Sequence, residues 1–204
     1  MHAVFLGVLS FLSGAVPYSV ILGKLLLKED IREYGDGNPG AANLWRAGGP
    51  LYGLTAVLLD LLKAFLPVYY ALTFYDFPSH TLMAIAIAPV AGHAFSPFLH
   101  FRGGKAVAST YGVWLALSGL TGGLLVMGAT MALFFILQTI DAWSVIMGMV
   151  ALFVYLFLND AEISIRLLCL VNLSIVLYKH RKDLKPVLKL RPAFATMIRR
   201  DKWV

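Results

Sequence analysis

Charged residues are scarce in this sequence. Asp, Glu, Lys and Arg make up only 14% of its 204 residues, where about 25% is usual, and 59% of the chain is hydrophobic. This composition argues against a soluble globular domain. The single cysteine, Cys169, lies inside an apolar run, so the chain has no intramolecular disulfide and no cysteine-based metal site. The sequence also lacks a Walker A loop, a Gly-x-Ser-x-Gly elbow and a His-Glu-x-x-His metal motif.

The sequence contains several long runs of apolar residues. A helix needs about 20 apolar residues to cross roughly 30 Å of hydrocarbon. The runs predict an all-α integral membrane protein with seven transmembrane helices in a single domain, 1–204, although Pro17 and Lys24 interrupt the first run. The expected spans are Ala3–Leu27, Leu51–Phe74, His80–Leu99, Ala106–Leu117, a fifth that ends near Thr139, Trp143–Leu158 and Ile163–Tyr178.

The distribution of Lys and Arg predicts the orientation, because positively charged loops stay in the cytoplasm. An amino terminus outside the membrane places 15 of the 17 basic residues on the inner side, nine of them in a basic cytoplasmic tail, 179–204. The last stretch of the tail, 193–204, mixes apolar and basic side chains, and we expect it on the membrane surface. The formal charge of +6 lies beside membrane-length segments, so anionic lipid or phosphate is a better partner than nucleic acid.

The longest polar break contains a glycine-rich patch, Gly35–Gly49. Three of its first six residues are glycines, with Asp36 and Asn38 between them. Such a segment takes positive φ and turns its N–H groups into one concavity, which binds phosphate oxygens without a side chain. A helical turn over Asn43–Ala47 would add a favourable dipole for an anion. A glycine-rich loop that merely turns is the alternative.

A second polar patch, Gly92–Lys105, ends in Gly-Gly-Lys at a membrane boundary. The glycines allow close backbone approach and Lys105 brings a compact cation with three donors, which together suit a phosphate. A lysine that only anchors the span end at the interface is the alternative. His93, near the inner end of the third run, either donates to a buried carbonyl or binds substrate.

A third patch, Tyr178–Asp183, closes the last run. Its ordinary interpretation is a positive-inside stop signal, in which His180 is the unusual member. Within the second run, Asp60 and Lys63 lie three residues apart on one helix face, and we expect them to pair inside the bilayer. The chemistry is therefore expected where the three cytoplasmic patches converge.

Four motifs together resemble the bacterial acyl-phosphate-dependent glycerol-3-phosphate acyltransferases, the PlsY family. They are Gly-Asp-Gly-Asn-Pro-Gly-Ala-Ala-Asn, Leu-Leu-Asp-Leu-Leu-Lys, Gly-His-Ala-Phe-Ser-Pro-Phe-Leu-His-Phe-Arg-Gly-Gly-Lys-Ala and Tyr-Lys-His-Arg-Lys-Asp. The resemblance implies seven helices in the bacterial inner membrane with the active site on the cytoplasmic side. It implies acyl transfer from acyl phosphate to glycerol 3-phosphate, without cofactor or metal, giving lysophosphatidic acid and phosphate for phospholipid biosynthesis. An anion-binding transporter and a catalytically inactive relative are the alternatives.

The resemblance also assigns roles to residues. It implies that the catalytic residues are Lys105, Arg46 and His180. It implies that substrate is bound by Asp36, Gly37, Asn38, Gly40, Asn43, His93, Gly103, Gly104, Arg181 and Asp183. Because convergent cations are present and the motifs of a nucleophile are not, we expect direct transfer without an acyl-enzyme.

This chain departs from the usual family pattern at four positions. The family usually has Ser, Thr, Asn and Gly where this chain has Asp36, Ala42, Asp183 and Ala106. An ionised carboxylate in the pocket would repel a substrate phosphate unless a cation neutralises it. We therefore expect Asp36 to pair with Arg46 or Arg181, with Lys105 as a third candidate.

Overall fold

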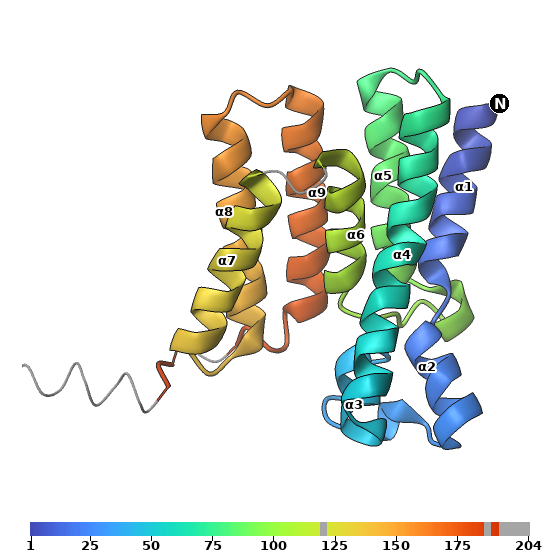
Figure 1. Cartoon of the computed structure of the whole chain (residues 1–204), viewed down its shortest axis with the longest axis vertical. Helices are drawn as coiled ribbons and strands as arrows, with labels where there is room; N and C mark the ends of the chain where they lie inside the picture. The colour runs from blue at the N-terminus through green and yellow to red at the C-terminus, as the bar shows by residue number, and fades with distance from the viewer. Residues whose placement is uncertain (119–121, 186–188, 192–204) are drawn as a thin grey trace, which may run out of the picture.

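The computed structural model describes residues 1–118, 122–185 and 189–191, and its regular structure is helical, as predicted (Figure 1). Short π and 3₁₀ turns cover Gly23–Leu27, Ile31–Glu33 and Pro97–Leu99. The α-helices are α1 His2–Ala15, α2 Tyr18–Leu22, α3 Ala41–Gly48, α4 Pro50–Phe74, α5 Ser79–Ala94, α6 Val107–Ser118, α7 Gly122–Leu137, α8 Asp141–Leu158 and α9 Ile163–His180.

Four helical segments are long and apolar enough to cross a membrane: α4, α8, α9, and α5 extended to Leu99. A fifth forms if α1 and Tyr18–Leu27, which are bent by 41° with respect to each other, are counted as one span. The helices α6 and α7 are apolar but shorter. The part of the chain that the structure describes therefore has four or five apolar spans of full length, and a count of seven stays a prediction.

The break between α1 and α2 follows from Pro17, which has no N–H to continue the helix. Two side chains from other segments donate to carbonyl groups at the break, where Tyr18 N also donates to the Val16 carbonyl at 3.1 Å. Ser96 Oγ donates to the Ala15 carbonyl at 2.6 Å, and Lys63 Nζ donates to the Val16 carbonyl at 2.7 Å. Lys63 is buried and forms the predicted ion pair with Asp60, at 2.6 Å. The broken helix is thus stabilised by a neutralised cation inside the bundle.

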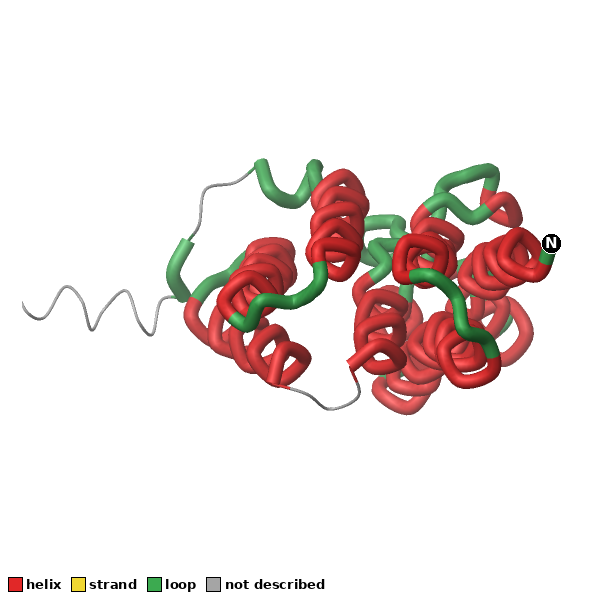
Figure 2. The backbone as a smooth tube through the Cα atoms, turned by 90° about the horizontal axis from the view of Figure 1, so that it is seen from above, coloured by secondary structure: helices red, strands yellow, loops and turns green. Residues whose placement is uncertain are grey.

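The helices form a bundle in which α7 and α8 stand apart from α1, α4 and α5, with α6 and α9 between them (Figures 1 and 2). A buried polar link joins the two central helices. Trp114 Nε1 of α6 donates to Asn172 Oδ1 of α9 at 3.0 Å, and the Asn172 amide donates to Thr110 Oγ1 at 2.9 Å. Large apolar side chains cover much of the outer surface, as expected of a protein surrounded by lipid.

The polar segments gather at the two ends of the bundle. The amino terminus and the α4–α5 and α8–α9 turns lie at one end (Figure 1). The helix α3, the loop before α6 and the end of α9 lie toward the other. The three polar patches of the sequence are thus brought to the same end.

A short stretch of the carboxyl-terminal tail packs against the α7–α8 turn. Leu190 forms an isolated antiparallel bridge with Gln138. Thr139 N donates to the Lys189 carbonyl and Arg191 N to the Leu137 carbonyl, both at 2.9 Å. The stretch 193–204, predicted to lie on the membrane surface, falls outside the described residues.

Candidate active site

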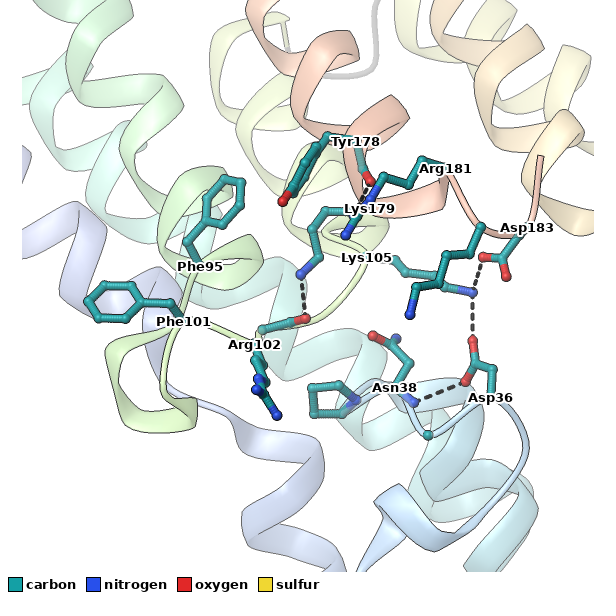
Figure 3. A pocket seen from close by; sticks show the side chains of 14 residues that line it. Asp36, Asn38, Phe95, Phe101, Arg102, Lys105, Tyr178, Lys179, Arg181 and Asp183 are labelled. Atoms are coloured by element: carbon teal, nitrogen blue, oxygen red, sulfur yellow. Dashed lines mark hydrogen bonds and ion pairs between the residues drawn. The ribbon is translucent and has the colours of Figure 1, made fainter. Parts of the chain in front are cut away.

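A pocket of about 340 Å³ opens where the three polar patches meet (Figure 3). The glycine-rich patch contributes Asp36, Gly37, Asn38 and Pro39. The other two patches contribute Phe95, Phe101, Arg102, Gly103 and Lys105, and Tyr178, Lys179, Arg181, Lys182 and Asp183. The predicted convergence of the three patches is therefore confirmed.

Lys105 lies between two carboxylates in this pocket (Figure 3). Its Nζ is 2.6 Å from Asp36 Oδ2 and 2.6 Å from Asp183 Oδ2. Burial acts to lower the pKa of Lys105, but the contacts with Asp183 and Asp36 outweigh it and raise the pKa above its ordinary value. Burial likewise acts to raise the pKa of Asp36, but hydrogen bonds from Lys105, Asn38 N and Asn43 lower it below its ordinary value. The Asp36–Lys105 ion pair is therefore charged at neutral pH.

The cation that pairs with Asp36 is neither Arg46 nor Arg181, the two partners expected first from the sequence. Its direct cation is Lys105, whereas Arg46 reaches it only through Asn43. Arg46 Nη1 donates to Asn43 Oδ1 at 2.7 Å, and the Asn43 amide donates to Asp36 Oδ1 at 3.0 Å. Arg46 is not part of the pocket wall. The expectation of Arg46 or Arg181 as the direct partner was wrong, because the fold places Lys105 nearer.

The glycine-rich patch has the predicted backbone shape in part. Gly35 and Gly37 take positive φ, 56° and 72°. Gly40 does not: its φ is −117°, and it precedes α3, which contains the predicted helical turn. The turn is fixed by Asp36 Oδ1, which accepts from Asn38 N at 3.1 Å. The carboxylate therefore orders the loop as well as pairing with the lysine.

The Gly103-Gly104 pair is required by packing. A Cβ atom at Gly103 would meet the His93 carbonyl, and one at Gly104 would meet the His93 ring. Gly104 N also donates to the His93 carbonyl at 3.0 Å. His93 is buried, with Nδ1 3.7 Å from Asp60 Oδ1. Among the described residues no carbonyl accepts from His93 Nδ1, so both alternatives for His93 stay open. The two glycines hold the lysine loop against the end of α5.

His180 lies behind the pocket wall. Its side chain is 3% exposed and its Nδ1 is 2.9 Å from the Val176 carbonyl. Its own carbonyl accepts from the backbone N–H groups of Asp183 and Leu184, at 2.8 and 3.0 Å. Arg181 does line the pocket, with its guanidinium 4.0 Å from the centre of the Tyr178 ring. In this arrangement the backbone carbonyl of His180 holds the loop that presents Asp183, while the ring contacts the Val176 carbonyl.

Sequence reasoning missed three pocket cations, Arg102, Lys179 and Lys182. Lys179 Nζ donates to the carbonyls of Ala94 and Gly103, at 2.8 and 2.7 Å, and so joins the third patch to the second (Figure 3). In the sequence these residues appear only as members of basic clusters at span ends. The packing of α9 against α5 brings them to the pocket, and this packing cannot be predicted from a local sequence pattern.

An apolar groove of about 370 Å³ adjoins the polar pocket and shares Asn38 and Lys105 with it. His93 and Asp60 also reach this groove. A third cavity of about 480 Å³ between α4, α6 and α7 shares Leu61 and Tyr111 with the groove. The remaining groove residues are Gly40, Ala41, Ala42, Val57, Val107 and Ala108. A molecule with a charged head and a long apolar chain can therefore place its head in the polar pocket and its chain in the adjoining groove.

Comparison with known proteins gives concordant results. A profile of the glycerol-3-phosphate acyltransferase family matches residues 4–190. The chain is 39% identical to glycerol-3-phosphate acyltransferase 1 of Thermotoga maritima over 91% of this chain and 97% of that one. It is 30% identical to the glycerol-3-phosphate acyltransferase of Aquifex aeolicus over 92% and 96% of the two chains.

Two crystal structures of PlsY, an integral membrane glycerol 3-phosphate acyltransferase, have the same fold. The glycerol 3-phosphate form superposes with a TM-score of 0.85 and 27% identity, over 97% of this chain and 99% of that one. The lysophosphatidic acid form has a TM-score of 0.82 and 29% identity, over 90% of each chain.

Proposed function

Because the chain belongs to the glycerol-3-phosphate acyltransferase family, it is a membrane acyltransferase of phospholipid synthesis, and we propose that its acyl donor is an acyl phosphate. In this proposal glycerol 3-phosphate is the acceptor, and lysophosphatidic acid and inorganic phosphate are the products. The PlsY structures with glycerol 3-phosphate and with lysophosphatidic acid support this choice of acceptor and product.

The position of Lys105 carries the proposal. Its side chain lines both the polar pocket and the apolar groove. A donor whose phosphate lies in the pocket and whose chain lies in the groove would place its acyl-phosphate linkage beside this ammonium. The groove continues toward the cavity bounded by α6 and α7, which gives a long acyl chain an apolar environment.

The reaction requires no covalent enzyme intermediate. A hydroxyl oxygen of glycerol 3-phosphate attacks the carbonyl carbon of the donor, and the new ester C–O bond forms as the bond from that carbon to the phosphate oxygen breaks. The bond electrons leave with inorganic phosphate, and a phosphate oxygen accepts the hydroxyl proton. The protein's contribution is to hold two anionic reactants together and stabilise the developing negative charge.

The pocket residues divide into direct ligands and residues that position them. We assign substrate phosphate to Lys105, Lys179 and Arg181. Arg46 acts through Asn43, and His180 acts through the loop that follows it. Both are therefore positioning residues in this proposal, where the sequence resemblance implied a catalytic role.

We also propose seven spans, with the amino terminus outside and the pocket on the cytoplasmic side of the bacterial inner membrane. The bent α1–α2 pair and the shorter α6 and α7 supply the three spans beyond the four long ones. Five cations line the pocket, which is formed by segments gathered toward one end of the bundle, and the positive-inside rule supports that end as cytoplasmic.

Purified protein tests the proposal directly. Given palmitoyl phosphate and radiolabelled glycerol 3-phosphate, it should form lysophosphatidic acid and release an equal amount of phosphate. Palmitoyl-coenzyme A in place of palmitoyl phosphate should give no product. Phosphate movement into liposomes without product would favour a transporter, and the absence of product with any donor would identify an inactive relative.

A further inference from the structure

We propose that Asp36 and Asp183 compete with phosphate for the Lys105 ammonium, so that the ammonium passes between carboxylate and phosphate in each catalytic cycle. The inference rests on the proposed function of this pocket as a phosphate site. According to this inference, the two carboxylates control the affinity of the pocket for phosphate and therefore the release of the phosphate product.

The geometry places carboxylate oxygens where phosphate oxygens are expected. Both Asp36 Oδ2 and Asp183 Oδ2 lie 2.6 Å from Lys105 Nζ, the distance of a charge-assisted hydrogen bond (Figure 3). An ammonium has three donors, so the two contacts occupy most of its capacity. A phosphate that binds Lys105 through two oxygens must therefore displace at least one carboxylate.

The surroundings show that these carboxylates are not merely neutralising excess charge. Four other cations line the pocket, Arg102, Lys179, Arg181 and Lys182, yet both acids contact the same lysine. Lys179 is directed to the carbonyls of Ala94 and Gly103. Among the described residues that line the pocket, Lys105 is thus the cation that forms ion pairs with two carboxylates.

The two carboxylates are attached to different parts of the chain. Asp36 is held by Asn38 N and the Asn43 amide at its other oxygen. Asp183 lies in the loop after α9, where its N–H donates to the His180 carbonyl. Either acid can therefore keep Lys105 paired when the other is absent. This redundancy predicts that the two substitutions are strongly non-additive.

The test measures binding of inorganic phosphate to the detergent-purified protein by calorimetry, apart from any turnover. Asp36→Ser and Asp183→Asn should each tighten phosphate binding by less than about tenfold, because one carboxylate still holds the lysine. The double variant should tighten it by about a hundredfold and by more than the product of the two single effects. When Lys105→Met is also present, the two aspartate substitutions together should tighten phosphate binding by no more than the product of their single effects.

Two controls keep the result specific. Asp30→Asn removes a carboxylate that pairs with Arg32 outside the pocket, and it should leave phosphate affinity unchanged. Asp36→Asn combined with Asp183→Asn retains the side-chain shapes and serves if the serine variant does not fold. Size-exclusion chromatography verifies the folded state of each protein.

The outcomes separate this inference from the proposed function. Additive effects, or weaker phosphate binding in the double variant, would overturn the competition even if acyl transfer persists. The expected non-additive tightening would support the competition even in a protein that transfers no acyl group. With competition, phosphate should also inhibit turnover of the double variant at about a hundredfold lower concentration than it inhibits the unchanged enzyme.

Discussion

Lys105 is the cation that lines both the polar pocket and the apolar groove. We expect Lys105→Met to reduce acyl transfer by about a hundredfold or more, since one donor to developing negative charge is worth about that much. Arg46→Ala should cause a smaller loss, because Arg46 acts through Asn43. Initial rates with palmitoyl phosphate measure both effects.

The control for this experiment is Lys185→Met, since Lys185 is exposed, lies close to the pocket in sequence and is not part of its wall. It should keep normal activity. Equal losses in the Lys105 and Lys185 variants would mean that general surface charge, rather than a phosphate contact, accounts for the effect.

The Asp36–Lys105 pair also has a defined dependence on pH. The folded pKa of Asp36 is below its ordinary value of about 3.9, so its contribution to stability is fully present above about pH 4 and is lost as pH falls through the folded value. The folded pKa of Lys105 is above its ordinary value of about 10.4, so its contribution is lost only as pH rises beyond that.

We therefore expect the difference in thermal stability between the unchanged protein and Asp36→Ser to be constant from about pH 5 to about pH 9 and to shrink below about pH 4. Thermal unfolding in detergent across this range measures the difference. A difference that changes steeply near pH 7 would mean that another titrating group controls the loop.

At this scale the sequence predicted the residue types of the pocket better than their pairings. The positive φ of Gly35 and Gly37 followed from local composition. The partner of Asp36 did not, because Arg46, Lys105 and Arg181 come from three segments and only the tertiary fold decides which one is nearest.

At the scale of elements, the broken first span depends on a buried ion pair. Lys63→Met would remove the donor to the Val16 carbonyl and leave Asp60 without its cation. We expect a loss of about 3 kcal/mol in the free energy of unfolding, the usual cost of leaving one buried charge unpaired. Unfolding of the purified protein in detergent measures it.

The matched variant Asp60→Asn with Lys63→Met removes both charges and should recover part of this stability. The Val16 carbonyl still lacks the Lys63 donor in that protein and keeps only the contact from Tyr18 N, so the recovery should be incomplete. A double variant as unstable as Lys63→Met would show that losing the carbonyl contact, and not leaving the carboxylate unpaired, causes most of the destabilisation.

Helix positions were largely predictable, since apolar runs and turn residues mark them in the sequence. The predicted run Ile163–Tyr178 lies within α9, and the interruption at Pro17 coincides with the observed break. The carbonyl contacts made there by Ser96 and Lys63 were not predictable, because they join segments dozens of residues apart.

At the scale of the whole molecule, the orientation in the membrane is the central prediction. Reporter domains that are active only outside the cytoplasm should give signal when fused to Met1 and none when fused to Val204. The reason is that five cations, Arg102, Lys105, Lys179, Arg181 and Lys182, line the pocket. The opposite pattern would place the pocket outside the cell and would exclude the proposed cytoplasmic site.

The bridge between Leu190 and Gln138 ties the carboxyl-terminal stretch to the α7–α8 turn. The segment that carries Asp183 begins at the end of α9 and is anchored again at the α7–α8 turn, so both of its ends are fixed. The carboxyl-terminal stretch 189–191 thus links the α7–α8 turn to the segment that carries Asp183.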